Sequence, residues 1–199
     1  MKLPTHVRIV DVGPRDGLQN QSEIVPLDAK IKLVEMLADA GVPSVEAGAF
    51  VSPKWVPQMA DTADVMRKIT RKPGVSYPVL VPNMKGYEAA RDSGCEEVAI
   101  FGAASETFSE KNINCSIAES LNQFAPVAEA AIADGIRVRG YISCVLGCPY
   151  EGDVSPEAVV NVAERREIYS QVALDAAKVG VKITITEITL PDLIKRVRD

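Results

Sequence analysis

Short runs rich in β-branched residues alternate with longer amphipathic segments, and this alternation limits the possible folds more than any other feature of the chain. The strand-like runs lie at residues 7–12, 43–50, 76–81, 97–102, 136–143 and 181–186. Strands that alternate with helices indicate a parallel sheet with right-handed crossovers. The fold is therefore expected to be α/β, either an open doubly wound sheet or a (β/α)8 barrel of the TIM-barrel type.

Several helical segments carry their own start or stop signals. Residues 27–41 have one apolar face and end at Gly41. Ser116 and Glu119 have the spacing of a capping box that opens the next long helix. A further helix, expected at 155–169, begins with Ser followed by Pro. About six βα units fit into the chain, and because a full barrel typically needs about 250 residues, a barrel here would be incomplete.

Composition excludes several functional classes. Of 199 residues, 47% are hydrophobic, enough for one substantial core, and the net charge of −5 offers no basic surface for nucleic acid. No run of 18 apolar residues and no secretion signal is found, which favours a cytoplasmic protein without a membrane partner. The four cysteines, two of them in a C-x-x-x-C spacing at Cys144 and Cys148, are expected to be free thiols.

The residues at the expected strand ends are the candidates for chemistry, because sites in parallel α/β folds lie at the carboxyl ends of strands. After the first strand, "GPRDG" places Arg15 beside Asp16. A carboxylate and a guanidinium on one turn suit a site that holds a divalent cation and neutralises an oxyanion, but an ordinary ion pair in a tight turn explains them as well. Glu46, among apolar neighbours in the second strand, either faces a functional interior or faces water at a strand end.

Five longer blocks resemble, in order and spacing, the 3-hydroxy-3-methylglutaryl-CoA lyase family. They read "VDVGPRDGLQN", "EAGAFVSPKWVPQMAD", "YPVLVPNMKGYEAA", "IFGAASETFSEKNINCSIAES" and "VRGYISCVLGCPYEGDVSP". The resemblance covers residues 7–165. The shorter R-D-G-x-Q signature also occurs in related isopropylmalate and homocitrate synthases, whereas the VSPKW and KNINCS blocks speak for the lyase branch.

The resemblance implies a TIM-barrel enzyme that cleaves hydroxymethylglutaryl-CoA into acetyl-CoA and acetoacetate by a retro-Claisen reaction, with a bound Mg²⁺ or Mn²⁺, in ketone-body formation and leucine degradation. By matching positions, Asp16 would be a metal ligand, Arg15 would bind the thioester and steady its enolate, and Glu46 would be a catalytic neighbour. The remaining positions that match substrate-binding residues are Gln19, Asn112 and Tyr141. Asp11 stands where the family usually has Glu.

The family pattern ends near residue 165. The His-x-His strand and the loop with the catalytic Cys that the family carries are absent from the sequence. We therefore expect five lyase-like βα units over 1–165 and a divergent tail over 166–199, which contributes one more strand and a short helix. Two interpretations stay open: a lyase of low or partner-dependent activity, or a catalytically inactive partial barrel that serves as a binding or scaffold module. An acyl-CoA is the expected ligand, and an open sheet edge at 181–186 favours a homodimer.

Overall fold

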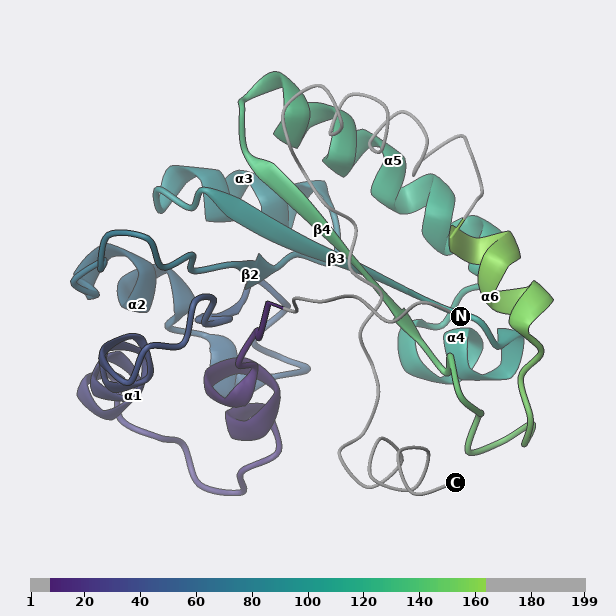
Figure 1. Cartoon of the computed structure of the whole chain (residues 1–199), viewed down its shortest axis with the longest axis horizontal. Coiled ribbons are helices and arrows are strands. Elements are labelled where there is room, and N and C mark those ends of the chain that lie inside the picture. The colour runs from purple at the N-terminus through teal and green to yellow at the C-terminus, as the bar shows by residue number, and fades with distance from the viewer. Residues whose placement is uncertain (1–7, 164–199) are drawn as a thin grey trace. The chain divides into compact units, whose positions relative to one another are not determined.

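The computed structural model of the protein describes residues 8–163 (Figure 1). The first part contains the π-helical turn η1 (Gly13–Gly17), α1 (Leu27–Asp39), β1 (Gly48–Ala49), the 3-10 turn η2 (Pro57–Met59), α2 (Thr62–Lys68), β2 (Val79–Leu80) and α3 (Met84–Asp92). It continues with β3 (Glu97–Ala103), α4 (Glu106–Ile113), α5 (Ile117–Ala133), β4 (Arg137–Ser143) and α6 (Pro156–Ala163). The strand predicted at 181–186 and the tail predicted over 166–199 lie outside the described residues.

The strands form one sheet in the order β1-β2-β3-β4. β1 runs parallel to β2, and β2 runs parallel to β3. Along β3 and β4, the Arg137 amide donates to the Glu96 carbonyl at 3.0 Å and the Ala104 amide donates to the Ser143 carbonyl at 2.9 Å. Both strands advance in the same direction between these bonds, so this pair is parallel too. The predicted sequential order of parallel strands is confirmed for these four.

The first two predicted strands are much shorter than expected. Within the described residues, the strand predicted at 7–12 pairs only through Asp11, in a parallel bridge with Val45. The strand predicted at 43–50 has regular pairing only at β1, with single bridges before it. The segment 76–81 is interrupted at Pro78, which has no N–H to donate, although its carbonyl accepts from Ala47 at 2.9 Å.

The helix signals read from the sequence are confirmed. α1 ends at Asp39, and Gly41 has the positive φ of +91° that terminates it. Ser116 and Glu119 form both hydrogen bonds of the capping box of α5. Ser155 accepts from the Ala158 amide at 3.1 Å at the start of α6. No helix among residues 8–163 is long and apolar enough to span a membrane.

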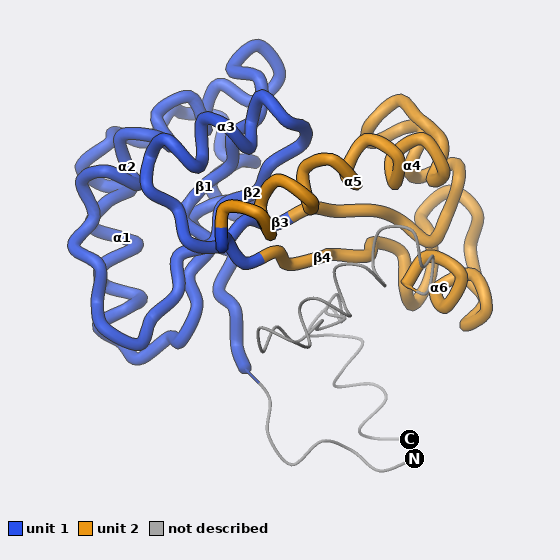
Figure 2. Tube along the Cα trace, turned by 90° about the horizontal axis from the view of Figure 1, so that it is seen from above, with its two compact units in different colours: residues 1–99, 135–137 blue, residues 100–134, 138–199 orange. Residues whose placement is uncertain are grey.

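The chain divides into two compact units, which are described separately (Figure 2). Among the described residues, the first comprises residues 8–99 and 135–137. Its buried side chains come from successive helices and strands, as in a layered α/β unit: Val34 of α1, Val65 of α2, Val79 of β2 and Tyr87 of α3, all at most 1% exposed. Burying these apolar side chains is the main force that holds the helices on the sheet.

Among the described residues, the second unit comprises residues 100–134 and 138–163. Here α5 packs on β3 through Phe124 and Phe101, whose ring centroids are 5.2 Å apart. α6 packs on the end of β4 in a core formed by Ala104, Ile142, Val159 and Val162. Each of the two long strands thus carries a helix that is attached to it by apolar contacts.

Candidate active site

The turn Gly13–Gly17 is closed by main-chain hydrogen bonds that converge on one carbonyl. The amides of Arg15, Asp16 and Gly17 donate to the Val12 oxygen at 3.1, 2.7 and 3.4 Å. The last of these is an i to i+5 bond, which makes the turn π-helical, a geometry common at functional sites. Pro14 costs nothing here, because its missing N–H lies in the first turn of the helix.

Asp11 shapes the entry to this turn. Its carboxylate accepts from the Gly13 amide at 2.8 Å. A Cβ at Gly13 would lie 2.9 Å from the same Asp11 oxygen, so the turn has room only for glycine unless the carboxylate moves. The shorter Asp, standing at the usual Glu position, therefore has a defined partner within its own turn.

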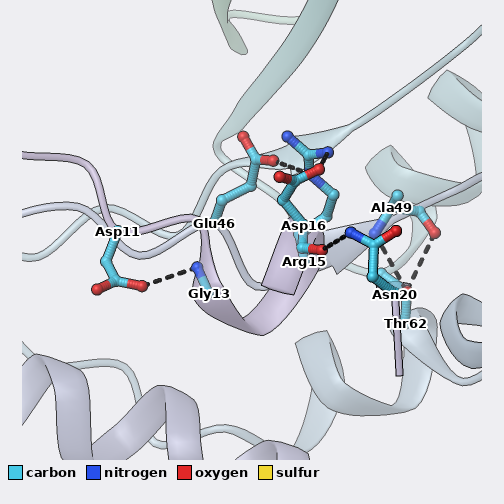
Figure 3. Close-up of polar contacts among 8 residues, drawn as sticks. All are labelled: Asp11, Gly13, Arg15, Asp16, Asn20, Glu46, Ala49 and Thr62. Carbon is cyan, nitrogen blue, oxygen red and sulfur yellow. Dashed lines mark hydrogen bonds and ion pairs between the residues drawn. The ribbon is translucent and has the colours of Figure 1, made fainter. Parts of the chain in front are cut away.

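The Arg15 guanidinium lies between two carboxylates (Figure 3). Its Nε donates to Glu46, and its Nη1 donates to Asp16 at 2.7 Å. The Arg15 side chain is only 15% exposed, whereas the Asp16 side chain is 54% exposed. Arg15 and Asp16 therefore form the ion pair within the turn that was one of the two interpretations of their adjacency. The buried Glu46 is a second partner of Arg15.

Glu46 is fully buried, with 0% of its surface exposed. Its backbone amide donates to the Asp11 carbonyl at 2.8 Å, which fixes the residue next to the turn. The alternative that Glu46 faces water at a strand end is therefore wrong. Because a buried carboxylate is costly without a charged or hydrogen-bonding partner, the contact with Arg15 is needed for stability as well as for geometry.

Three further groups of contacts stabilise the surroundings of the turn. Asn20 donates from its side-chain amide to the Asp16 carbonyl at 2.9 Å (Figure 3). The Thr62 hydroxyl lies 3.1 Å from the Ala49 carbonyl and accepts from the Ala49 amide at 3.3 Å, so α2 is attached to β1 (Figure 3). Lys30 is 5% exposed and donates to the Asp61 carboxylate at 2.7 Å, which ties α1 to the residue before α2.

The predicted site residues fall into the two units. Arg15, Asp16 and Glu46 are brought together in the first, and Gln19 follows η1 on the same segment, partly exposed. Asn112 lies exposed in α4 and Tyr141 lies partly buried in β4, both in the second unit. A shared site that includes all of these residues stays a prediction.

The structure adds a polar cluster at the start of α4, whose members the sequence did not show to be neighbours. Ser105 caps the helix by accepting from the Phe108 amide at 3.1 Å, and Glu151 accepts from the Thr107 amide at 2.9 Å. The Ser105 hydroxyl also donates to the Cys148 sulfur at 3.0 Å. The C-x-x-x-C spacing and the adjacent Glu were visible in the sequence, but their proximity to Ser105 depends on how the chain folds back after β4.

Among residues 8–163, no three His, Cys, Asp or Glu side chains stand close enough together to hold a metal ion. Asp16 offers one carboxylate, and one of its oxygens is already paired with Arg15. A divalent cation such as Mg²⁺ favours about six oxygen ligands, so the described residues do not by themselves fit such an ion.

Comparison with known proteins places the chain among lyases. The family described as HMGL-like matches residues 6–195. The bovine protein named hydroxymethylglutaryl-CoA lyase, mitochondrial, is 63% identical over 163 residues, which are 82% of this chain and 50% of that protein. The zebrafish protein named 3-hydroxy-3-methylglutaryl-CoA lyase, cytoplasmic, is 60% identical over 82% of this chain and 49% of its own length. The chain spans about half the length of the curated relatives it matches.

A solved structure shows the same relation in three dimensions. An HMG-CoA lyase from Acinetobacter baumannii, in complex with coenzyme A and 3-methylmalate, is 33% identical and superposes with a TM-score of 0.74. The match covers 94% of this chain and 59% of that one. With the sequential parallel sheet of the described residues, this likeness gives the fold as an incomplete (β/α) barrel of the TIM-barrel type.

Proposed function

The chain belongs to the HMGL-like family, a family of carbon–carbon lyases, and on that premise we propose that Arg15, Asp16 and Glu46 form part of a site that binds and cleaves hydroxymethylglutaryl-CoA. The products would be acetyl-CoA and acetoacetate, as ketone-body formation and leucine degradation require. The observation that carries the proposal is the guanidinium of Arg15 held between a fully buried Glu46 and Asp16.

The chemistry of the cleavage explains why a fixed cation is needed. When the tertiary hydroxyl loses its proton, the neighbouring carbon–carbon bond breaks and its electron pair moves onto the thioester as an enolate. Negative charge then develops on the thioester oxygen, and an oriented guanidinium stabilises it without reorganising. Glu46 is the residue that orients Arg15, because it is buried and binds Nε. Gln19, Asn112 and Tyr141 are proposed to bind the rest of the substrate.

The proposed function also includes a divalent cation. The resemblance implies Mg²⁺ or Mn²⁺ on Asp16, which would acidify the hydroxyl when bound. Since the described residues do not by themselves fit such an ion, no step of the reaction is assigned to it here. Asp16 has a role without it: its carboxylate binds Nη1 at 2.7 Å and helps to fix the plane of the guanidinium.

The ligand, the oligomeric state and the cellular location of the chain are proposals as well. An acyl-CoA ligand is supported by the names of the relatives and by the coenzyme A in the Acinetobacter structure. A homodimer joined through the sheet edge and a cytoplasmic location are further proposals. The location is supported by the zebrafish relative, while the bovine relative is named mitochondrial. The division of the chain near residue 165 is proposed on the sequence blocks alone.

A second candidate function is a binding module that retains the ligand but does not turn it over. It is favoured by residues 8–163, among which no group of three or more His, Cys, Asp or Glu side chains could hold a metal ion. Both candidates require Arg15 to meet the thioester, so the first experiment tests that contact.

The test is calorimetric titration of hydroxymethylglutaryl-CoA into the full chain and into Arg15→Lys. Lysine keeps the charge but loses the fork that binds Glu46 and Asp16 together. We expect binding to weaken about tenfold, the loss of one charge-assisted hydrogen bond of about 1.5 kcal/mol. The control is Arg67→Lys, in an exposed pair with Asp64 at 3.5 Å on α2. Equal affinities of Arg15→Lys and wild type, with the fold intact by circular dichroism, would refute the proposal.

A further inference from the structure

The turn after β4 carries two thiols that the proposed function does not use. Cys144 follows the strand directly and is partly exposed, and Cys148, four residues on, is 6% exposed. Cys148 and Gly152 exchange both backbone hydrogen bonds, at 2.7 and 2.9 Å, so the chain returns on itself at this point. Cys144 has φ of +64°, a left-handed conformation that a cysteine rarely adopts and that is often found at functional positions.

The Cys148 sulfur is surrounded by hydrogen-bond donors. The Ser105 hydroxyl donates to it at 3.0 Å and the Tyr150 amide donates at 3.4 Å. The Cys144 thiol is a further hydrogen-bond partner of Cys148. Burial would raise the pKa of Cys148, but these hydrogen bonds outweigh it and lower the pKa below its ordinary value. A thiol of this kind is more readily ionised at neutral pH than an ordinary one.

From this arrangement we propose that Cys144 and Cys148 form a modification site, a dithiol that a small disulfide of the oxidised-glutathione class converts reversibly into an intramolecular disulfide. Cys144 is the entry thiol, because it is the more exposed of the two. Cys148 is the resolving thiol, because it is buried and hydrogen-bonded to its neighbour. Disulfides of intracellular proteins are usually of this transient, regulatory kind.

The exchange proceeds in two steps that balance. The Cys144 thiolate attacks one sulfur of the small disulfide, a mixed disulfide forms, and one small thiolate leaves. The Cys148 thiolate then attacks the Cys144 sulfur, and the second small thiolate leaves. Two protein thiols are oxidised, one small disulfide is reduced to two thiols, and the two protons lost by the protein are taken up by the leaving thiolates.

The other two cysteines differ in the properties that matter. Cys95 is 5% exposed, and burial, the largest cause, raises its pKa to about 11. Cys115 is partly exposed, but burial and the nearby carboxylates of Glu119 and Glu106 raise its pKa. Both should therefore react slowly with a small disulfide, which makes them internal controls.

Oxidation of the two cysteines would also change the start of α4, the helix that follows β3. Ser105 donates to the Cys148 sulfur and at the same time caps α4 by accepting from the Phe108 amide. Once Cys148 is bonded to Cys144, its sulfur is drawn toward a new partner and the hydrogen bond with Ser105 is lost or lengthened. The first turn of α4 should then open more often in the oxidised protein than in the reduced one.

The experiment is incubation of the reduced full chain with oxidised glutathione, followed by intact-mass and peptide mass spectrometry. The wild type should lose two hydrogen masses, with the crosslink in the peptide that contains both cysteines. Cys148→Ser should instead accumulate glutathione on Cys144, because nothing resolves the mixed disulfide. The matched controls are Cys95→Ser and Cys115→Ser, which should form the crosslink as the wild type does.

Rates and amide exchange complete the test. Cys144 should react faster than Cys115, whose pKa is raised by burial and by nearby carboxylates, and amide exchange at Phe108 should accelerate on oxidation and return on reduction. Glutathione that stays on Cys144 in the wild type, or a Cys115 that reacts first, would overturn the proposal. The wild-type crosslink is read without any variant, so a variant that fails to fold does not decide the outcome.

Discussion

At the scale of single residues, the site depends on one buried charge. Glu46 has no exposed surface and is tied to Arg15, so the two side chains form a unit that the sequence shows only as two separate motifs. Removing one member of a buried pair usually costs about 3 to 5 kcal/mol. For this reason a truncation of Arg15 would mix lost binding with lost stability, whereas a lysine at that position separates them.

The first residue-scale prediction concerns Gly13. In Gly13→Ala, the new Cβ would lie 2.9 Å from the Asp11 carboxylate and push it off the Gly13 amide. We expect the free energy of unfolding to fall by about 1 kcal/mol, measured by urea titration. Gly17→Ala is the matched control, because nothing lies within 4 Å of its Cβ; it should be neutral or slightly stabilising. Equal losses in the two variants would contradict this account of the turn.

At the scale of helices and strands, the sequence predicted most of what the structure contains. The alternation of β-branched runs with amphipathic segments predicted four parallel strands in sequential order. The capping box predicted where α5 begins. Strand lengths could not be read in the same way: the β-branched run at 76–81 predicts one continuous strand, whereas Pro78, which has no N–H to donate, interrupts its pairing. The burial of Glu46 could not be predicted from the sequence either, because it depends on how the turn at residues 13–17 lies against β1.

The element-scale prediction is a pH dependence at α4. The hydrogen bond from the Thr107 side chain, followed by that from its amide, lowers the pKa of Glu151 below its usual range. A lowered pKa in the folded state means stability that is present above the ordinary pKa and is lost as the pH falls through the folded value. The thermal midpoint of the wild type should therefore fall more steeply below about pH 4.5 than that of Glu151→Gln.

Glu110→Gln on the same helix serves as the control for that measurement. Glu110 is exposed, and its substitution changes the net charge by the same amount. It should leave the steep acid branch of the stability curve in place. If Glu110→Gln flattens the curve as much as Glu151→Gln does, net charge rather than the cap of α4 is responsible.

At the scale of the whole molecule, membership of the family does not by itself establish activity. The chain belongs to the HMGL-like family over residues 6–195, yet among residues 8–163 no group of three or more His, Cys, Asp or Glu side chains could hold a metal ion. The sequence blocks predicted the family, which is confirmed, because long motifs survive in order. They could not place Asn112 and Tyr141 against Arg15, because those residues lie in a second unit of the fold.

The whole-molecule prediction is that the purified chain does not turn over hydroxymethylglutaryl-CoA measurably, even with millimolar Mg²⁺ or Mn²⁺. Loss of a general acid alone usually lowers the rate by about 10² to 10⁴, and loss of metal polarisation removes several kcal/mol more. A coupled assay for acetoacetate measures this. Robust turnover that disappears in Asp16→Ala would show instead that residues outside 8–163 or a second chain complete the metal site.

The three amides gathered on the Val12 carbonyl have a consequence for how this turn could diversify. Main-chain amides close the loop on the Val12 carbonyl and the Asp11 carboxylate binds the Gly13 amide, so these hydrogen bonds do not require particular side chains at positions 15 and 16. The side chains at positions 15 and 16 can therefore be substituted within the same backbone, provided that residue 46 is substituted to match them. Descendants of such a turn could thus acquire new ligand preferences through a few paired substitutions while the surrounding backbone is inherited unchanged.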